Sequence, residues 1–262
     1  MIGHVSAPAP RLLMRLFALE RLLSQLYSDD CAPRTICEIG PGLGDAASYT
    51  LSRFAPVRFD LYEAAGTARE HLKDRFGRVS EISVLSRFEA SPGSYDLILA
   101  FEVVEHIEDD VRLLSDICAS LAPGGRFIGS VPAFMRKWQA VDEYAGHVRR
   151  YEPDEMAGKL EEAGFVQSAL TVYGAPLTNL LYLPRQLHYR SRTSGSSTEE
   201  RHAATLDSGI SRDLVRRFDA RLVVPAVRAF AALQHLPWLA SRGDGLLFHG
   251  RRPEDGRSVH GG

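Results

Sequence analysis

Short apolar runs alternate with segments of helical periodicity through most of this chain. The apolar runs predict strands over residues 35–39, 57–62, 81–85, 95–101, 126–131 and 165–172. Helices are predicted between them, over residues 45–54, 67–76, 109–121 and 153–163. Strands that alternate with helices pair in parallel, with helices covering both faces of the sheet. We therefore predict an α/β fold built on a doubly wound parallel sheet.

The segments on either side of this core have a different pattern. Apolar side chains recur at helical spacing over residues 11–27, which predicts an amphipathic helix. After residue 173 the alternation stops until a final strand is predicted at residues 245–250. The predicted parts are an N-terminal helix (1–30), a core (31–173), a helical insertion or cap (174–243) with a flexible linker near 191–200, a last strand (244–252) and a polar tail (253–262).

The charge and the cysteine content limit which partners and which cellular location we expect. The chain carries 31 basic and 33 acidic residues, a net charge of −2, so a nucleic acid partner is not expected. The three cysteines lack C-x-x-C spacing, which predicts free thiols and a cytoplasmic location. The insertion is rich in Leu, Tyr, Pro and Arg, and three interpretations of it stay open: a lid over an apolar ligand, a homodimer surface and a peripheral membrane face.

The first predicted strand runs into a glycine-rich turn and then into a helix. Gly40, Gly42 and Gly44 let the backbone approach a ligand closely, and the start of the helix offers free N–H donors. A dinucleotide oxidoreductase uses a similar turn, but its glycines follow the spacing G-x-G-x-x-G. The spacing here predicts a ligand-binding loop and argues against a pyrophosphate.

Two acidic residues lie beside this loop. Glu38 precedes the first glycine by two residues, where it either binds a ligand amine or holds the loop itself. Glu63 ends the second strand, about where a carboxylate reaches the two hydroxyls of a ribose. Asp60 is the alternative if the strand is shifted.

A cluster of carboxylates and imidazoles is predicted after the fourth strand. Glu102, Glu105 and His106 occupy positions i, i+3 and i+4, which share one face of a helical turn. Two carboxylates at so short a distance repel each other. Protonation, an arginine or a divalent cation relieves the repulsion. His147 follows the next strand and is expected on the same rim of the sheet.

Four segments occur in the order and spacing of class I S-adenosylmethionine-dependent methyltransferases: Glu38–Gly44, Glu63 after a strand, Tyr95–Ile107 and Leu121–Gly125. The sequence resembles this family from Arg34 to about Val172 and again at the last strand. The resemblance implies a Rossmann-like sheet of seven strands, the last one antiparallel, with S-adenosylmethionine lying across the carboxyl ends of the first strands.

The resemblance also implies roles for single residues. Gly40 and Gly42 would face the methionine part of the cofactor, Glu63 the ribose, and Phe101 with Glu102 the region near the methyl sulfonium. The family usually has an Asp near the end of the third strand that contacts the adenine. This chain departs from that pattern, and the candidates for the contact are Ser86, Arg87 and Phe88.

The acid and imidazole cluster resembles the metal site of small-RNA 2′-O-methyltransferases and ubiquinone-pathway O-methyltransferases. By that resemblance Glu102, Glu105, His106 and His147 would bind Mg²⁺, Mn²⁺ or Zn²⁺, which lowers the pKa of an acceptor hydroxyl. The alternative is a structural role for these side chains. Without a metal, His147 or His106 is the candidate general base, a role worth typically ~10²–10⁴-fold in rate.

The residues after His147 leave a further choice. Arg149, Arg150 and Tyr151 either hold an anionic or sugar-like acceptor or pair with nearby acids, and pairing is favoured for Arg150. The function predicted is methyl transfer to an oxygen of a small molecule such as a sugar, phenol or specialised metabolite. N- or C-methylation on the same fold and cofactor binding without turnover are the alternatives.

Overall fold

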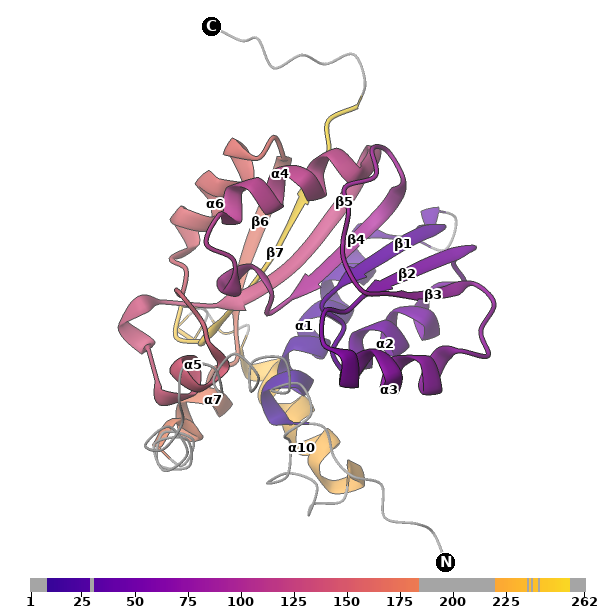
Figure 1. Ribbon diagram of the computed structural model, residues 1–262. Helices are drawn as coiled ribbons and strands as arrows, with labels where there is room; N and C mark the ends of the chain where they lie inside the picture. Colours follow the sequence, from indigo (N-terminus) through magenta and orange to yellow (C-terminus); the bar gives the residue numbers. More distant parts are fainter. Residues whose placement is uncertain are drawn as a thin grey trace, which may run out of the picture.

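The computed structural model describes residues 9–28, 31–183, 220–234, 236, 238–239 and 241–254, and its centre is one seven-stranded sheet (Figure 1). The strands are β1 (Thr35–Ile39), β2 (Arg58–Tyr62), β3 (Ile82–Leu85), β4 (Tyr95–Phe101), β5 (Leu121–Pro132), β6 (Val166–Tyr173) and β7 (Gly245–Arg251). Their order is β3-β2-β1-β4-β5-β7-β6, and β7 pairs antiparallel with both of its neighbours. The predicted fold class is confirmed.

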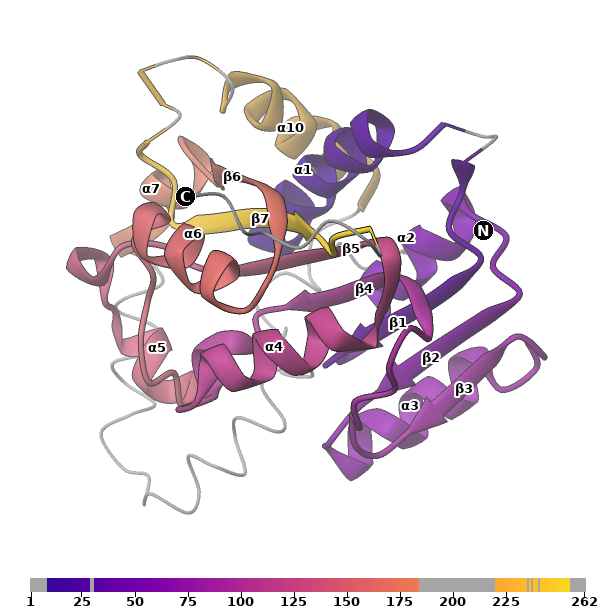
Figure 2. The ribbon, with the colours of Figure 1, turned by 90° about the horizontal axis from the view of Figure 1, so that it is seen from above.

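Helices cover both faces of this sheet. They are α1 (Pro10–Leu26), α2 (Asp45–Arg53), α3 (Gly66–Phe76), α4 (Asp110–Ser120), α5 (Ala140–Ala145), α6 (Pro153–Glu162), α7 (Leu177–Leu180) and α10 (Ala220–Leu233), with 3₁₀ turns η2 (Val104–His106) and η3 (Met135–Lys137). Seen from above, α1 and α10 lie on one side of the central strands and α4 and α6 on the other (Figure 2). Two separate apolar cores follow from this arrangement.

Strand β4 shows why its sequence reads as one apolar run. Leu97, Leu99 and Phe101 point into the core under α1 and α2. Ile98 and Ala100 point into the opposite core under α4 and α6. Successive side chains of a strand alternate between faces, so a central parallel strand with both faces covered needs apolar residues at nearly every position.

Helices α1 and α10, which are far apart in the sequence, pack together on one face of the sheet. Helix α1 begins at Pro10, whose missing N–H costs nothing at the first position of a helix. Its buried residues include Leu19 and Leu23, which join the same core as Val227 and Ala231 of α10. Helices α1 and α10 lie side by side in both views (Figures 1 and 2). The predicted N-terminal helix therefore covers the sheet close to the site described below.

The insertion is described only at its two ends, as α7 and α10. Residues 184–219 lie outside the described residues, and so does the predicted linker near 191–200. No helix in the described part of the chain combines the length and hydropathy needed to cross a membrane. Helix α5, between β5 and α6, is an element that the sequence pattern did not predict.

Candidate functional site

The carboxyl ends of β1, β2 and β4 bring the predicted site residues to one edge of the sheet. These strands are neighbours, because β1 pairs in parallel with β2 on one side and with β4 on the other. Glu38 lies in β1, Glu63 follows β2 and Glu102 follows β4. The outer side of such carboxyl ends is where open α/β sheets bind ligands.

The loop after β1 needs its glycines for two different reasons. Gly40, Gly42 and Gly44 have φ values of +66°, +56° and +77°, a region that other residues adopt only with strain. A Cβ on Gly40 would lie 2.6 Å from Val103, and one on Gly44 would lie 2.5 Å from Phe76. A Cβ on Gly42 would meet no described atom within 4 Å. The loop is packed at both ends and open at Gly42.

Glu63 holds this loop in place. Its Oε2 accepts from the backbone N–H of Gly42 at 2.9 Å, and its Oε1 accepts from the N–H of Ala65 at 2.9 Å. Each oxygen keeps a lone pair for a further donor. Asp60, the alternative to Glu63, accepts instead from the hydroxyl of Tyr95 at 2.7 Å.

Glu38 is a buried carboxyl group beneath the loop. The residue is 2% exposed, and its Oε2 has no hydrogen-bond partner within the described part of the chain. Burial raises the pKa of Glu38 to about 8, against the opposing charge of Arg15. Buried polar atoms normally have a hydrogen-bond partner, so this oxygen of Glu38 is a candidate to accept a hydrogen bond from a ligand.

The expectation that Glu102 converges with Glu105 and His106 is wrong. Glu102 has a φ of +58° and lies outside the 3₁₀ turn that carries the other two residues. Its carboxylate turns toward α1, where Arg11 donates to Oε2 at 2.7 Å and Nη1 of Arg15 lies 3.7 Å from Oε1. Although burial opposes ionisation, the two arginines lower the pKa of Glu102 to about 2.

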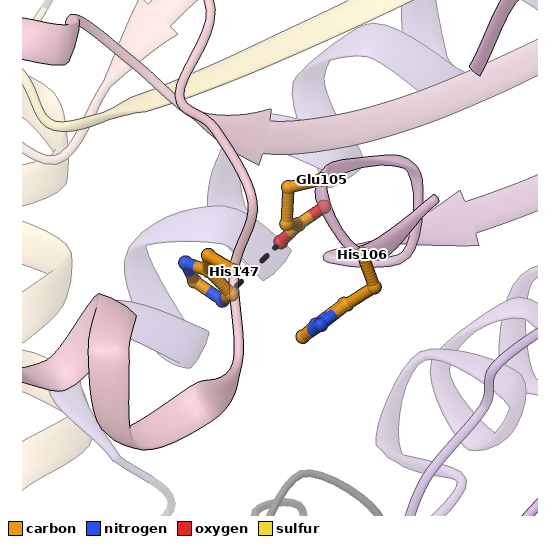
Figure 3. A group of neighbouring side chains, drawn as sticks. All are labelled: Glu105, His106 and His147. Carbon is orange, nitrogen blue, oxygen red and sulfur yellow. Dashed lines mark ion pairs between the residues drawn. The ribbon is translucent and has the colours of Figure 1, made fainter. Parts of the chain in front are cut away.

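Glu105, His106 and His147 do come together, from η2 and from the loop after α5 (Figure 3). One ligand atom of each lies within 4.8 Å of the others. Nε2 of His147 lies 3.7 Å from Oε1 of Glu105, and the two imidazole rings meet edge to face. Glu105 is fully buried, and neither carboxylate oxygen has a hydrogen-bond partner among the residues described.

Burial and neighbouring charges disfavour the charged forms of two of these three groups. Burial, followed by the charge of Glu102, raises the pKa of Glu105 well above its ordinary value. Burial, followed by the charge of His147, lowers the pKa of His106 to about 4. Nδ1 of His106 lies 3.3 Å from the carbonyl oxygen of Gly146, so its Nε2 is the nitrogen left for the site.

Sequence reasoning missed Asp142, the carboxylate behind His147. Its Oδ1 lies 2.8 Å from Nδ1 of His147, and Arg150 donates to both of its oxygens, at 3.0 Å and 2.7 Å. Burial opposes ionisation, but donors from His147 and Arg150 lower the pKa of Asp142 to about 2. Arg150 is thus paired with an acid, as favoured from the sequence. No spacing rule links Asp142 to His147, because the link depends on the unpredicted helix α5.

The neighbouring candidates for acceptor binding are occupied. Arg149 donates to Oδ2 of Asp110 at 3.0 Å, and the hydroxyl of Tyr151 donates to the same oxygen at 2.8 Å. Both of these residues therefore pair with an acid. Of the candidates for the adenine contact, Phe88 is half-buried and meets the ring of Tyr62 edge to face, with centroids 5.5 Å apart.

Comparisons with known proteins agree with this architecture. A family model described as a methyltransferase domain matches residues 5–168. The chain is 30% identical over 169 residues, 63% of its length, to a Mycolicibacterium smegmatis protein named as a probable S-adenosylmethionine-dependent methyltransferase. It is 26% identical over 183 residues, 69% of its length, to a Mycobacterium tuberculosis protein of the same description. The chain therefore belongs to the methyltransferase-domain family.

The matches cover only part of the related proteins, which limits the conclusions that they support. The alignments span 65% and 64% of the length of the two mycobacterial proteins. Among solved structures, Haemonchus contortus phosphoethanolamine N-methyltransferase 2 in complex with S-adenosyl-L-methionine superposes with a TM-score of 0.56 at 15% identity. That likeness covers 90% of this chain and 52% of the nematode chain, and it supports the fold.

Proposed function

We propose that this chain transfers the methyl group of S-adenosylmethionine to an oxygen of a small-molecule acceptor. The observation that carries the proposal is the pairing of an open loop with an unsatisfied acid. Gly42 leaves space free of described atoms, and Glu38 beneath it has a buried oxygen without a donor. A ligand that carries a cationic amine and can approach the backbone closely fits this pair. The methionine part of S-adenosylmethionine has that chemistry.

The other cofactor contacts follow from the same edge. The loop of Gly40, Gly42 and Gly44 would face the methionine part, and the free lone pairs of Glu63 would accept from the ribose hydroxyls. Phe101 is 5% exposed at the end of β4, and the guanidinium of Arg15 lies 5.3 Å from its ring centroid. We expect Phe101 and Glu102 to lie near the methyl sulfonium of the bound cofactor.

Arg15 is placed to bind the carboxylate of the methionine part of the cofactor. Its Nε is buried and has no hydrogen-bond partner among the described side chains and backbone. Its charge acts on both Glu38 and Glu102. A zwitterionic amino acid group bound between Glu38 and Arg15 would give each of them an opposite charge. This arrangement supports the methionine part of the cofactor as the ligand.

The donor set of Glu105, His106 and His147 fits a divalent cation. The set offers one carboxylate and two imidazole nitrogens within 4.8 Å of one another, and both oxygens of Glu105 lack hydrogen-bond donors in the described chain. Two imidazoles favour Zn²⁺ or Mn²⁺ over Mg²⁺, which prefers oxygen. A cation held there would lower the pKa of an acceptor hydroxyl. Glu102 has no part in this set.

His147 can also act without a metal. Its Nδ1 is fixed by Asp142, and its Nε2 faces the same space as Glu105. His106 is a weak base, because its pKa is lowered to about 4. In either case the residues at this rim would take the proton of the acceptor hydroxyl, and alignment of that oxygen with the methyl group would supply most of the rate.

The partners and location follow from the same features. A small-molecule acceptor fits a rim lined by a few polar side chains, and the net charge of −2 does not favour nucleic acid. Cys31, Cys37 and Cys118 are free thiols, which supports a cytoplasmic location. The proposals of a homodimer and of a peripheral membrane contact rest on the insertion.

Calorimetry and turnover test this proposal together. We expect S-adenosylhomocysteine to bind, and methyl transfer from labelled S-adenosylmethionine to be found in a panel of sugar, phenol and amine acceptors. Loss of turnover with chelator, restored by Mn²⁺ or Zn²⁺, supports the metal; turnover that chelator leaves unchanged supports His147 as the base. Transfer to amines alone would replace O- by N-methylation. A chain that binds the product without turnover over the whole panel would contradict the enzyme assignment.

Glu105→Gln and Glu108→Gln form a matched pair for this experiment. The two residues lie three positions apart, one fully buried in the cluster and the other exposed. We expect the first variant to lose turnover and to keep affinity for S-adenosylhomocysteine. The second should behave as the wild type.

A further inference from the structure

The carboxylate of Asp142 is surrounded by four nitrogen atoms at hydrogen-bond distance. Its Oδ1 lies 2.8 Å from Nδ1 of His147 and accepts from Nε of Arg150 at 3.0 Å. Its Oδ2 accepts from Nη2 of Arg150 at 2.7 Å and from the backbone N–H of Gln139 at 2.7 Å. Four nitrogen partners match the number of acceptor positions of one carboxylate, so its orientation is fixed.

This arrangement determines which nitrogen of His147 carries the proton. Three of the four nitrogens belong to groups that can only donate, and an ionised carboxylate can only accept. The two N–H groups of the Arg150 guanidinium and the backbone N–H of Gln139 stabilise the ionised form of this carboxylate. Nδ1 of a neutral His147 must then be the protonated nitrogen. Nε2 is left with a lone pair, 3.7 Å from Oε1 of Glu105.

We propose that Asp142, held by Arg150 and Gln139, is the positioning residue that sets His147 in its Nδ1–H tautomer and aims the bare Nε2 at Glu105. The role rests on the proposed function, since a base or a metal ligand both need that lone pair. Backbone contacts support it: the N–H of His147 donates to the carbonyl of Asp142 at 2.9 Å, and the N–H of Val148 donates to the carbonyl of Glu105 at 3.0 Å. The backbone that carries the ring is thus tied to both Asp142 and Glu105.

In the variant Asp142→Asn we expect the opposite tautomer of the His147 ring. An amide NH₂ in the place of Oδ2 would face two obligate donors, Arg150 and the backbone of Gln139. An NH₂ in the place of Oδ1 faces one obligate donor and His147, which can become an acceptor by moving its proton to Nε2. The second arrangement is less costly, so the asparagine should switch His147 to the Nε2–H tautomer.

Long-range ¹H–¹⁵N correlation spectra of the labelled full chain, recorded with chelator, report this proton directly. We expect the wild type to show His147 as Nδ1–H with Nε2 unprotonated, and Asp142→Asn to reverse the two nitrogens. His147→Gln assigns the signals by their loss. Equilibrium dialysis with Mn²⁺ gives a second readout, with affinity expected to fall about 10- to 100-fold in Asp142→Asn.

Asp110→Asn is the matched control. Asp110 is also buried and also clamped by basic and hydroxyl donors, from Arg149, Tyr151 and Lys159, but it does not contact His147. This variant should leave the tautomer of His147 unchanged. His106, whose Nδ1 faces a carbonyl oxygen, is an internal reference that should not change in either variant.

An Nε2–H ring in the wild type would overturn the proposal, as would an Nδ1–H ring that persists in a folded Asp142→Asn. If that variant does not fold, the wild-type spectrum still decides, because the role requires a protonated Nδ1. The tautomer is read without cofactor or acceptor. Failure to find methyl transfer would therefore leave it standing, and failure of the tautomer would leave transfer standing.

Discussion

Arg11 in α1 donates to the carboxylate of Glu102 at 2.7 Å across 91 positions of sequence. The contact ties the helix that begins the described chain to the residue that follows the central strand β4. Both side chains are about a fifth to a quarter exposed, so the ion pair is partly withdrawn from solvent. Helix α1 thereby contacts one of the residues of the candidate site.

Arg11→Met should lower the free energy of unfolding by about 1.5–3 kcal/mol, the usual range for a hydrogen bond to a charged group. Glu102→Gln combined with it in a double-mutant cycle should show positive coupling, because each variant removes the same contact. Urea denaturation measures the free energy of unfolding of each variant. The exposed pair of Arg228 and Glu20 is the control, and Arg228→Gln should change stability by about 0–1 kcal/mol. Additive losses would show that the contact is not energetically real.

Glu63→Ala should weaken binding of S-adenosylhomocysteine about 10- to 100-fold, equivalent to about 1.4–2.8 kcal/mol. The variant removes both the ribose acceptor and the hydrogen bond that holds Gly42. Isothermal calorimetry gives the affinity. Asp60→Asn is the comparison, because Asp60 faces Tyr95 and should leave the affinity within about threefold. Equal affinities for Glu63→Ala and wild type would remove Glu63 from the site.

Glu38→Gln should flatten the pH dependence of stability. The pKa of Glu38 is about 8 in the folded chain against 4.5 ordinarily, so the folded state binds the proton more tightly. Its contribution to the free energy of unfolding is therefore fully present below about pH 4.5 and is lost as pH rises toward 8. Denaturation at pH 5, 6.5 and 8 checks this in the ligand-free protein. Parallel pH profiles for the variant and the wild type would show that the pKa of Glu38 is not raised in the folded protein.

Mn²⁺ binding should separate the two glutamates that follow β4. Glu105→Gln should weaken Mn²⁺ by at least about tenfold, because it removes the anionic ligand of the set. Glu102→Gln should leave Mn²⁺ binding near the wild-type value, since the carboxylate of Glu102 faces Arg11. Electron paramagnetic resonance of free Mn²⁺ measures both. Equal loss in the two variants would restore the four-residue site expected from the sequence.

Gly42→Ala and Gly44→Ala should differ in a diagnostic way. Both force an L-residue into a left-handed backbone, at about 1–2 kcal/mol each. Only the Cβ at position 44 also collides with Phe76, so Gly44→Ala should be about 1–3 kcal/mol less stable than Gly42→Ala. Gly42→Ala should instead lose affinity for S-adenosylhomocysteine, because its methyl group enters the open space. Unchanged affinity would mean that the ligand does not approach Gly42.

The sequence by itself determined the elements and the loop. Strand β1 and the start of α2 fall where the pattern predicts them, because alternation in strands and 3.6-residue periodicity in helices are local consequences of burial. The positive φ values of Gly40, Gly42 and Gly44 are similarly local, since glycine alone adopts that region without strain. The position of Glu63 beside the loop also follows, because parallel neighbours end at the same edge.

Only the tertiary structure decided where the charged side chains point. Glu102 shares its spacing with Glu105 and His106, yet a φ of +58° and two arginines from α1 take it out of their cluster. Asp142 reaches His147 through a short helix with no periodic signature. The physical reason is range: backbone preferences act over a few residues, whereas a carboxylate takes the cations that packing brings within about 4 Å, however far apart they are in the sequence.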